Sequence, residues 1–246
     1  MKHLGHTRSS FERDHFLITP DTFVRAPLPG MHKATAIVHA APGMGARFTQ
    51  YTVEFEKEGV LGPARAQRFI YVLEGKLRAG KPGPTRDLSP GSYLYIPPGE
   101  ELELRALKTT RAAVIEKPRV QSKDAPANFP GPVSGEERNQ KAIAFLGDNA
   151  VHARQLLPET PEFDFAVNTM TFQPGATLPM VEAHVMEHGL LMLTGEGIYR
   201  LGDKWYPVTA GDFIWMAPYC PQWFGALGKT ETKYLIYKDW NRHPLD

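Results

Sequence analysis

The sequence lacks several features that define large classes of protein. It has a single cysteine, Cys220, so an intramolecular disulfide is impossible, which fits a reducing compartment. No stretch approaches the roughly 18 consecutive apolar residues of a membrane-spanning helix. Residues 1–20 contain no apolar run resembling a signal peptide. These absences predict a soluble cytoplasmic protein with no membrane partner.

An excess of charge of either sign is also missing. Lys and Arg number 28 against 27 Asp and Glu, which gives a formal net charge of +1. This balance does not indicate the extended basic surface of a nucleic-acid-binding protein. Apolar residues make up 42% of the chain, enough to fill a core.

Helical periodicity is scarce, and residues 139–145 are the one stretch where it predicts a short helix. Gly and Pro, 22 of each, instead separate short runs rich in β-branched and aromatic residues. This pattern predicts an all-β sandwich or barrel. The expected strands are residues 48–55, 69–73, 92–96, 166–172, 190–193, 213–216 and 233–237. Residues 198–208, with Gly202-Asp203 at the centre, predict a hairpin.

The two halves of the chain repeat one another. Residues 71–77 (YVLEGKL) match 191–197 (LMLTGEG), and residues 88–97 (LSPGSYLYIP) match 208–217 (VTAGDFIWMA). Both matches have the same offset of 120 positions, which is hard to obtain by chance. The repeat predicts two copies of one β-barrel.

Domain boundaries follow from this repeat and from a stretch rich in Pro and Gly after residue 119. We expect an N-terminal arm over 1–35, a first barrel over 36–119, a linker over 120–145 and a second barrel over 146–246.

A candidate metal site lies in the second half. Glu182, His184 and His188 have the same parity, so on an extended chain they would share one face. A carboxylate and two imidazoles inside an apolar barrel are costly unless a partner such as a divalent metal binds them. Any one histidine alone would more simply be a hydrogen-bonded structural residue, and the case rests on the triple. Glu187 has the opposite parity, and we expect it behind the ligands or towards solvent.

This triple resembles the first motif of the cupin superfamily, HxHxxxE followed by six residues and Gly. Glu182 stands at the first His place, His184 at the second and His188 at the Glu place, and Gly195 ends the motif. The second cupin motif begins with Gly and ends in His, and here it begins at Gly211 and ends at Gln222. The resemblance implies a duplicated cupin fold, or bicupin (double-stranded β-helix or jelly-roll barrels).

The first half lacks the same ligand set. An offset of 120 from the four ligand positions leads to Gly62, Ala64, Arg68 and Leu102, none of which is a metal ligand. The N-terminal cupin is therefore expected to be a metal-free structural half.

The permuted ligand set resembles the (S)-ureidoglycine aminohydrolase family. The resemblance also covers residues 18–21, 91–99, 197–199 and 234–242, so it spans nearly the whole chain. It implies a Mn²⁺-dependent enzyme that releases ammonia from (S)-ureidoglycine, a small ureido acid, in purine catabolism. Position by position, the implied metal ligands are Glu182, His184, His188 and Gln222. The implied substrate-binding residues are Glu182, Gln222, Tyr234 and Lys238. The implied catalytic residues are Glu182, Tyr199 and Lys238, and the residues do not decide whether Glu182 or Tyr199 transfers the proton.

Two alternatives stay open. One is another single-metal cupin enzyme, such as a dioxygenase or isomerase. The other is a non-enzymatic small-molecule-binding cupin, in which Tyr199 and Tyr234 only fill the barrel and Lys238 is a solvated strand-end charge. Two barrels with exposed sheet edges also predict a homo-oligomer, a dimer or larger.

Overall fold

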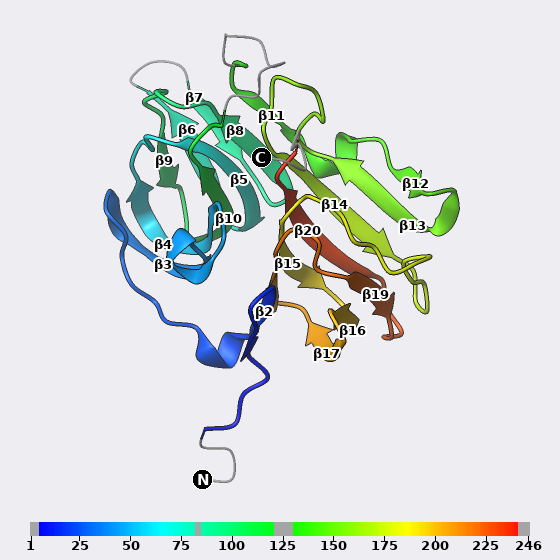
Figure 1. Cartoon of the computed structure of the whole chain (residues 1–246). Coiled ribbons are helices and arrows are strands. Elements are labelled where there is room, and N and C mark those ends of the chain that lie inside the picture. The colour runs from blue at the N-terminus through cyan, green and yellow to red at the C-terminus, as the bar shows by residue number, and fades with distance from the viewer. Residues whose placement is uncertain (1–4, 82–84, 121–129, 241–246) are drawn as a thin grey trace. The chain divides into compact units, whose positions relative to one another are not determined.

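The computed structural model describes residues 5–81, 85–120 and 130–240, and in them the chain is built from strands (Figure 1). The helical elements of these residues are short 3-10 turns: η1 (Pro20–Thr22), η2 (Pro42–Met44) and η3 (Glu137–Asn139). The strands are β1 (Ser10–Phe11), β2 (His15–Ile18), β3 (Met31–Ala40), β4 (Thr49–Leu61), β5 (Gln67–Glu74), β6 (Leu77–Gly80), β7 (Thr85–Leu88), β8 (Ser92–Ile96), β9 (Glu103–Ala106), β10 (Thr110–Lys117), β11 (Val133–Glu136), β12 (Ile143–Phe145), β13 (Asp148–Gln155), β14 (Ala166–Phe172), β15 (His188–Thr194), β16 (Glu196–Leu201), β17 (Lys204–Thr209), β18 (Phe213–Met216), β19 (Gln222–Ala226) and β20 (Thr232–Lys238). The all-β prediction is confirmed, and each expected strand overlaps an observed one.

The chain forms two compact units. Unit 1 comprises Met1–Phe23, Lys141–Pro158 and Phe165–Asp246, and unit 2 comprises Val24–Gln140 and Glu159–Asp164. Each unit therefore includes a segment from the other half of the sequence. The boundaries expected after residues 35, 119 and 145 were taken from the repeat in the sequence. They did not group residues 1–23 with the second barrel or residues 159–164 with the first.

The predicted linker, residues 120–145, is not all connecting loop. Residues 121–129 lie outside the described part. Beyond them, β11 pairs with β8 and β12 pairs with β13. The short helix expected over 139–145 was wrong. Part of this segment forms β12, and its pairing with β13 outweighs the weak helical periodicity.

The described residues of unit 1 form two sheets. The larger has the order β1-β2-β18-β15-β20-β14-β13-β12, and the smaller has the order β17-β16-β19. The predicted hairpin is confirmed, because β16 and β17 pair antiparallel up to Leu201 and Lys204. Inward side chains of both sheets form one apolar core, which includes Met192, Ile214, Phe224 and Ile236.

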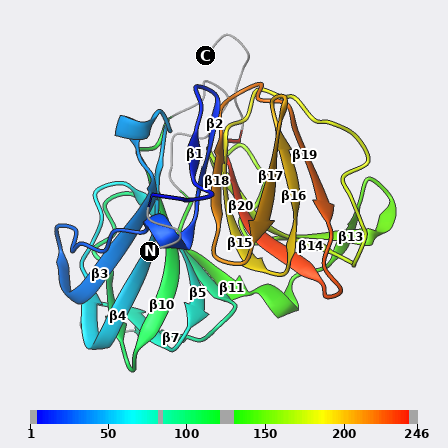
Figure 2. The same cartoon turned by 90° about the horizontal axis from the view of Figure 1, so that it is seen from below.

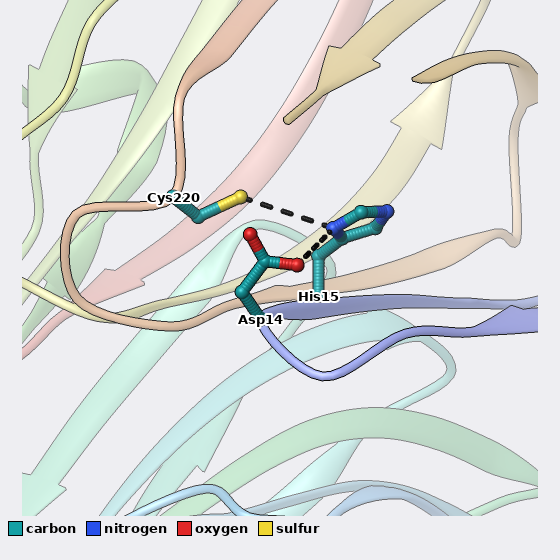
Figure 3. Close-up of side chains that lie close together, drawn as sticks. All are labelled: Asp14, His15 and Cys220. Atoms are coloured by element: carbon teal, nitrogen blue, oxygen red, sulfur yellow. Dashed lines mark hydrogen bonds and ion pairs between the residues drawn. The ribbon is translucent and has the colours of Figure 1, made fainter. Parts of the chain in front are cut away.

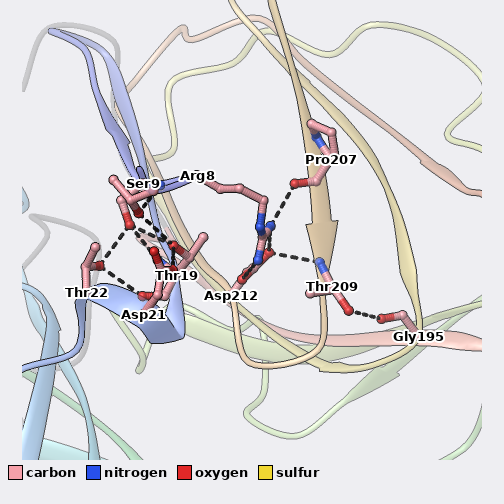
Figure 4. A network of polar contacts seen from close by, with 10 residues as sticks. Arg8, Ser9, Thr19, Asp21, Thr22, Gly195, Pro207, Thr209 and Asp212 are labelled. Atoms are coloured by element: carbon pink, nitrogen blue, oxygen red, sulfur yellow. Dashed lines mark hydrogen bonds and ion pairs between the residues drawn. The ribbon is translucent and has the colours of Figure 1, made fainter. Parts of the chain in front are cut away.

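Strand β2 completes the larger sheet from the N-terminal end of the sequence. All four of its residues are buried, and it pairs antiparallel with β18 (Figure 2). The segment before it is held by Arg8, whose guanidinium donates two hydrogen bonds to the fully buried carboxylate of Asp212, at 2.6 and 2.8 Å (Figure 4). The N-terminal segment is therefore part of unit 1 rather than a free arm.

Unit 2 repeats the same strand order. Its run β8-β5-β10-β4 corresponds to β18-β15-β20-β14, and β9-β6-β7 corresponds to β19-β16-β17. Even a tight turn is repeated: Gly75 and Gly195 both have positive φ, +89° and +75°. A Cβ at either would lie within 2.4 Å of the hydroxyl of the facing Thr110 or Thr232. The duplication predicted from the offset of 120 is therefore present in the structure.

The helices of the described residues give no membrane span, since none is long and apolar enough to cross a bilayer.

Candidate metal centre

His188 opens β15 and points one ring nitrogen into the barrel of unit 1. It is 3% exposed and pairs in register with Met216 on one side and Lys238 on the other. Its Nδ1 lies 3.1 Å from the carbonyl oxygen of Tyr237. A carbonyl only accepts, so Nδ1 carries the proton and Nε2 presents a lone pair. This is the tautomer that a metal-binding histidine needs.

His184 faces that lone pair from a loop. Its Nε2 lies 3.2 Å from His188 Nε2, and its backbone carbonyl accepts a hydrogen bond from Tyr219 N at 2.7 Å. Two imidazole nitrogens bound side by side to one ion at about 2.1 Å stand about 3 Å apart. The observed separation therefore fits two ligands of one ion.

Gln222, the first residue of β19, brings a third side chain to the same point. Its backbone pairs with Glu182 in both directions, at 2.8 and 2.9 Å. Its Nε2 lies 3.1 Å from His184 Nε2, and its Oε1 accepts a hydrogen bond from the Tyr199 hydroxyl at 3.2 Å. Ligation through oxygen needs a half-turn of this carboxamide, after which the Tyr199 hydroxyl can accept from the amide nitrogen.

Glu182 is placed differently from the two histidines. Burial raises the pKa of its carboxyl group, and the nearby ammonium of Lys238 opposes that rise. The same carboxylate raises the pKa values of Tyr199 and Tyr234, though less than burial does, so it lies near both phenols. With His184 and His188, however, it does not form a group whose ligand atoms all lie within 4.8 Å of one another in the described residues.

Lys238 and Tyr234 come from β20, on the opposite side of His188 from β18. Lys238 Nζ lies 3.2 Å from the Asn168 carboxamide oxygen when the amide is oriented to donate to the Val167 carbonyl oxygen at 3.0 Å. Tyr234 is 1% exposed, and its hydroxyl lies 3.4 Å from the sulfur of Met170. Asn168 was not predicted from the sequence, because no motif points to it.

Burial in the site favours the neutral form of both imidazoles. Burial is the main cause that lowers the pKa of His188 well below 6.5, and the neighbouring His184 and Lys238 lower it further. Burial also lowers the pKa of His184. Neutral imidazoles are the form that binds a metal.

The segment from Glu182 to His188 is not one extended strand, as equal parity had assumed. Glu182 forms an isolated bridge to Gln222, His184 lies in irregular backbone, and only His188 is in a strand. The side chains meet because β19 and the Tyr219 loop hold this segment in place, not because it is extended. Glu187 is fully buried and accepts a hydrogen bond from the Trp215 indole at 3.1 Å, so it faces away from solvent.

Unit 2 has an ion pair at the equivalent place. Arg68 pairs in register with Glu116, as His188 does with Lys238. Its guanidinium donates to Glu116 Oε1 at 2.6 Å and to the carbonyl oxygen of Gly62, the counterpart of Glu182, at 2.7 Å. Tyr51 also donates to Glu116, at 2.9 Å. At the place in unit 2 that corresponds to the candidate metal centre, the positive charge is therefore the guanidinium of Arg68.

The donor set of unit 1 fits a divalent metal. His184 and His188 offer neutral nitrogens, Gln222 an amide oxygen and Glu182 a carboxylate on the adjoining backbone bridge. Such a mixed nitrogen and oxygen set without thiolate suits Mn, Fe, Co, Ni or Zn. The residues that could hold the ion are therefore the four predicted ones. Among them, the Glu182 carboxylate lies outside the close group that His184, His188 and Gln222 form.

Comparison with known proteins first defines the class. A cupin domain model matches residues 168–237, which include every predicted site residue except Lys238. Oxalate decarboxylase from Bacillus subtilis shares the fold, with a TM-score of 0.71 and 9% identity over 96% of this chain and 80% of that one. The chain is a bicupin, as the duplicated strand order shows.

Closer relatives then define the family. Curated proteins named probable (S)-ureidoglycine aminohydrolase from Oryza sativa and (S)-ureidoglycine aminohydrolase from Arabidopsis thaliana are 40% and 39% identical over 98% of this chain, and the matches cover 78% and 80% of them. A putative glyoxylate-induced protein from Pseudomonas aeruginosa has a TM-score of 0.87 and 31% identity over 98% of this chain and 93% of that one. The chain belongs to the (S)-ureidoglycine aminohydrolase family.

Proposed function

We propose that this chain hydrolyses (S)-ureidoglycine to (S)-ureidoglycolate and ammonia in allantoin and allantoate catabolism. The observation that carries the proposal is the meeting of His184, His188 and Gln222 beside Lys238, in a chain about two-fifths identical to curated enzymes of that name. A site with the ammonium of Lys238, two neutral imidazoles and the single carboxylate of Glu182 suits an anionic amino acid derivative.

We assign Glu182, His184, His188 and Gln222 to the metal, and Mn²⁺ as the ion. A bound divalent cation supplies a Lewis acid that anchors and orients an anionic substrate. The set carries one negative charge and two neutral imidazoles, so a site holding a divalent cation keeps a net positive charge, which favours a carboxylate as its guest.

Lys238 is the residue that we assign to the substrate carboxylate. Its ammonium lies close enough to lower the pKa values of Glu182, His184 and His188, so it stands on the same side of the barrel as they do. Asn168 holds its nitrogen from the neighbouring strand. A fixed ammonium recognises a carboxylate as a point charge. Tyr234 and Gln222 complete the wall around it.

Loss of ammonia requires a proton on the departing amine and removal of one from water. We assign this transfer to Tyr199 or Glu182. Tyr199 is fully buried and donates to Gln222, so it also orients that carboxamide. Comparison of Tyr199→Phe with Glu182→Gln separates the roles when manganese content is measured on the same samples, because Glu182 is also assigned to the metal: the residue that moves the proton lowers kcat even in the fully loaded protein.

The proposal is tested with freshly prepared ureidoglycine and the manganese-loaded protein. Ammonia should appear faster than from the unstable substrate alone, and the product should be the S enantiomer of ureidoglycolate. The double variant His184→Ala, His188→Ala is the control and should leave only the spontaneous rate. Oxygen uptake, substrate isomerisation or binding without ammonia release would point to another cupin function instead.

A further inference from the structure

A second group of metal-ligating side chains lies in unit 1, apart from the candidate metal centre. Asp14 and His15, at the start of β2, face Cys220, in the loop before β19 (Figure 3). One ligand atom from each lies within 4.8 Å of the others. His15 Nδ1 is 2.9 Å from Asp14 Oδ1 and 4.0 Å from Cys220 Sγ. All three point their ligand atoms towards one another.

The far side of the His15 ring is also held. Its Nε2 lies 2.9 Å from the hydroxyl of Tyr206 on β17. A hydroxyl both donates and accepts, so Tyr206 supports either tautomer of His15. When the proton is on Nε2, Nδ1 presents its lone pair to the cluster. This is how a polar partner behind the ring prepares a histidine for a metal.

The three residues differ in their exposure to solvent. His15 and Cys220 are 3% and 4% exposed, whereas the Asp14 side chain is 48% exposed. Two ligands are thus desolvated and the third opens to solvent, where an ion can enter and a water molecule can occupy a further position. The arrangement has three protein ligands and one open side.

We propose that Asp14, His15 and Cys220 form a second metal site, for a thiophilic divalent cation of the Zn²⁺ class. In tetrahedral geometry a bound sulfur and nitrogen stand about 3.5 Å apart. The observed 4.0 Å therefore needs a movement of only about half an ångström. On binding, the thiol proton of Cys220 leaves to solvent and the Nδ1 proton of His15 moves to Nε2.

Electrostatics support the same reading. The repulsion between a thiolate and a carboxylate is what a divalent cation between them removes, because the three charges then sum to zero. The simpler role is a hydrogen-bonded anchor that ties the N-terminal strand to the loop, and the experiment separates the two.

The donor chemistry makes the two sites distinguishable. The centre at His184 and His188 has no sulfur, whereas the second site includes Cys220, the one cysteine of the chain. Absorption from thiolate-to-cobalt charge transfer can therefore arise only from Cys220. Co²⁺ is the probe, added to protein whose first site is already filled with Mn²⁺, with Zn²⁺ as the competitor.

We expect one equivalent of Co²⁺ to give this absorption and one equivalent of Zn²⁺ to remove it. Loss of one supporting contact at a metal site typically costs about 10- to 100-fold in affinity. Asp14→Asn should weaken binding by about tenfold, and His15→Gln should weaken it more. Glu12→Gln, two positions away and outside the cluster, is the matched control and should leave the affinity unchanged.

The proposal is overturned if saturating Co²⁺ gives no charge-transfer absorption. It is also overturned if the absorption persists with unchanged affinity in both Asp14→Asn and His15→Gln, since Cys220 would then bind cobalt as an isolated thiol. The half-exposed position of Asp14 makes Asp14→Asn the variant that keeps the fold, and its thermal unfolding midpoint checks this.

Discussion

Replacement of Lys238 by methionine tests the substrate side of the site. Methionine keeps an unbranched apolar stem of similar length and removes the charge. The position is sensitive because the Lys238 ammonium is held by Asn168 at 3.2 Å, and it lies 5.8 Å from the centre of the Trp240 ring. The ammonium therefore has a defined place beside the two histidines.

The expected loss follows from the kind of contact. Two unit charges 4 Å apart attract by about 4 kcal/mol near a protein surface, before any cost of desolvation. A hydrogen bond to a charged group contributes about 1.5–3 kcal/mol net. We therefore expect kcat/KM for ureidoglycine to fall by about 10- to 100-fold in Lys238→Met. Bound manganese should not decrease, because Lys238 is a cation and binds no metal.

The assay is ammonia release at several substrate concentrations, with manganese measured on the same samples. Lys238→Arg keeps the charge and should retain more activity than Lys238→Met. Lys229→Met removes an exposed lysine of the same unit and should have no effect. Wild-type kinetics in Lys238→Met would refute the reasoning and leave Lys238 as a surface charge.

Three further predictions concern the metal and the two barrels. Gln222→Glu adds a charge at a ligand position, so manganese should bind at least as tightly by calorimetry while ureidoglycine turnover falls; no change in either would place Gln222 away from the metal. Arg68→Met leaves Glu116 without its cation and should lower the free energy of unfolding in urea by about 3 kcal/mol, with partial recovery in Arg68→Met, Glu116→Gln; equal stability of all forms would contradict this. His39 is 1% exposed, and burial lowers its pKa to about 3, so the unfolded chain takes up its proton near pH 6.5 and the folded chain does not. Stability from this group should be complete above pH 6.5 and fall by about 1.4 kcal/mol per pH unit below it, down to about pH 3, and His39→Gln should reduce that slope in denaturant titrations.

Local sequence patterns predicted nine of the twenty strands in the described residues, and comparison of the sequence with itself predicted the repeat. Short runs rich in β-branched and aromatic residues located β14 and β18 to the residue, and the constant offset of 120 predicted two copies of one strand order. The first signal is local and the second compares the sequence with itself, so neither requires knowledge of which strands pair. The meeting of His184, His188 and Gln222 was predicted through the cupin motif and is present in the structure.

Long-range pairings could not be predicted. No local signal shows that His15–Ile18 completes the sheet beside β18, or that β11 does the same beside β8. The Asp14, His15 and Cys220 cluster depends on that pairing, so it too was missed. Parity predicted the Glu182 carboxylate beside the imidazoles, but the segment is irregular, and its side chain is placed by the bridge to Gln222.

The most direct test of the account is the number of manganese ions per chain. Purified protein saturated with Mn²⁺ and freed of excess should hold one equivalent, and His184→Ala, His188→Ala should hold none. We expect no second ion in unit 2, because Arg68 and Glu116 form an ion pair at the equivalent place. Two equivalents of manganese per chain, or full occupancy in the double variant, would contradict the account.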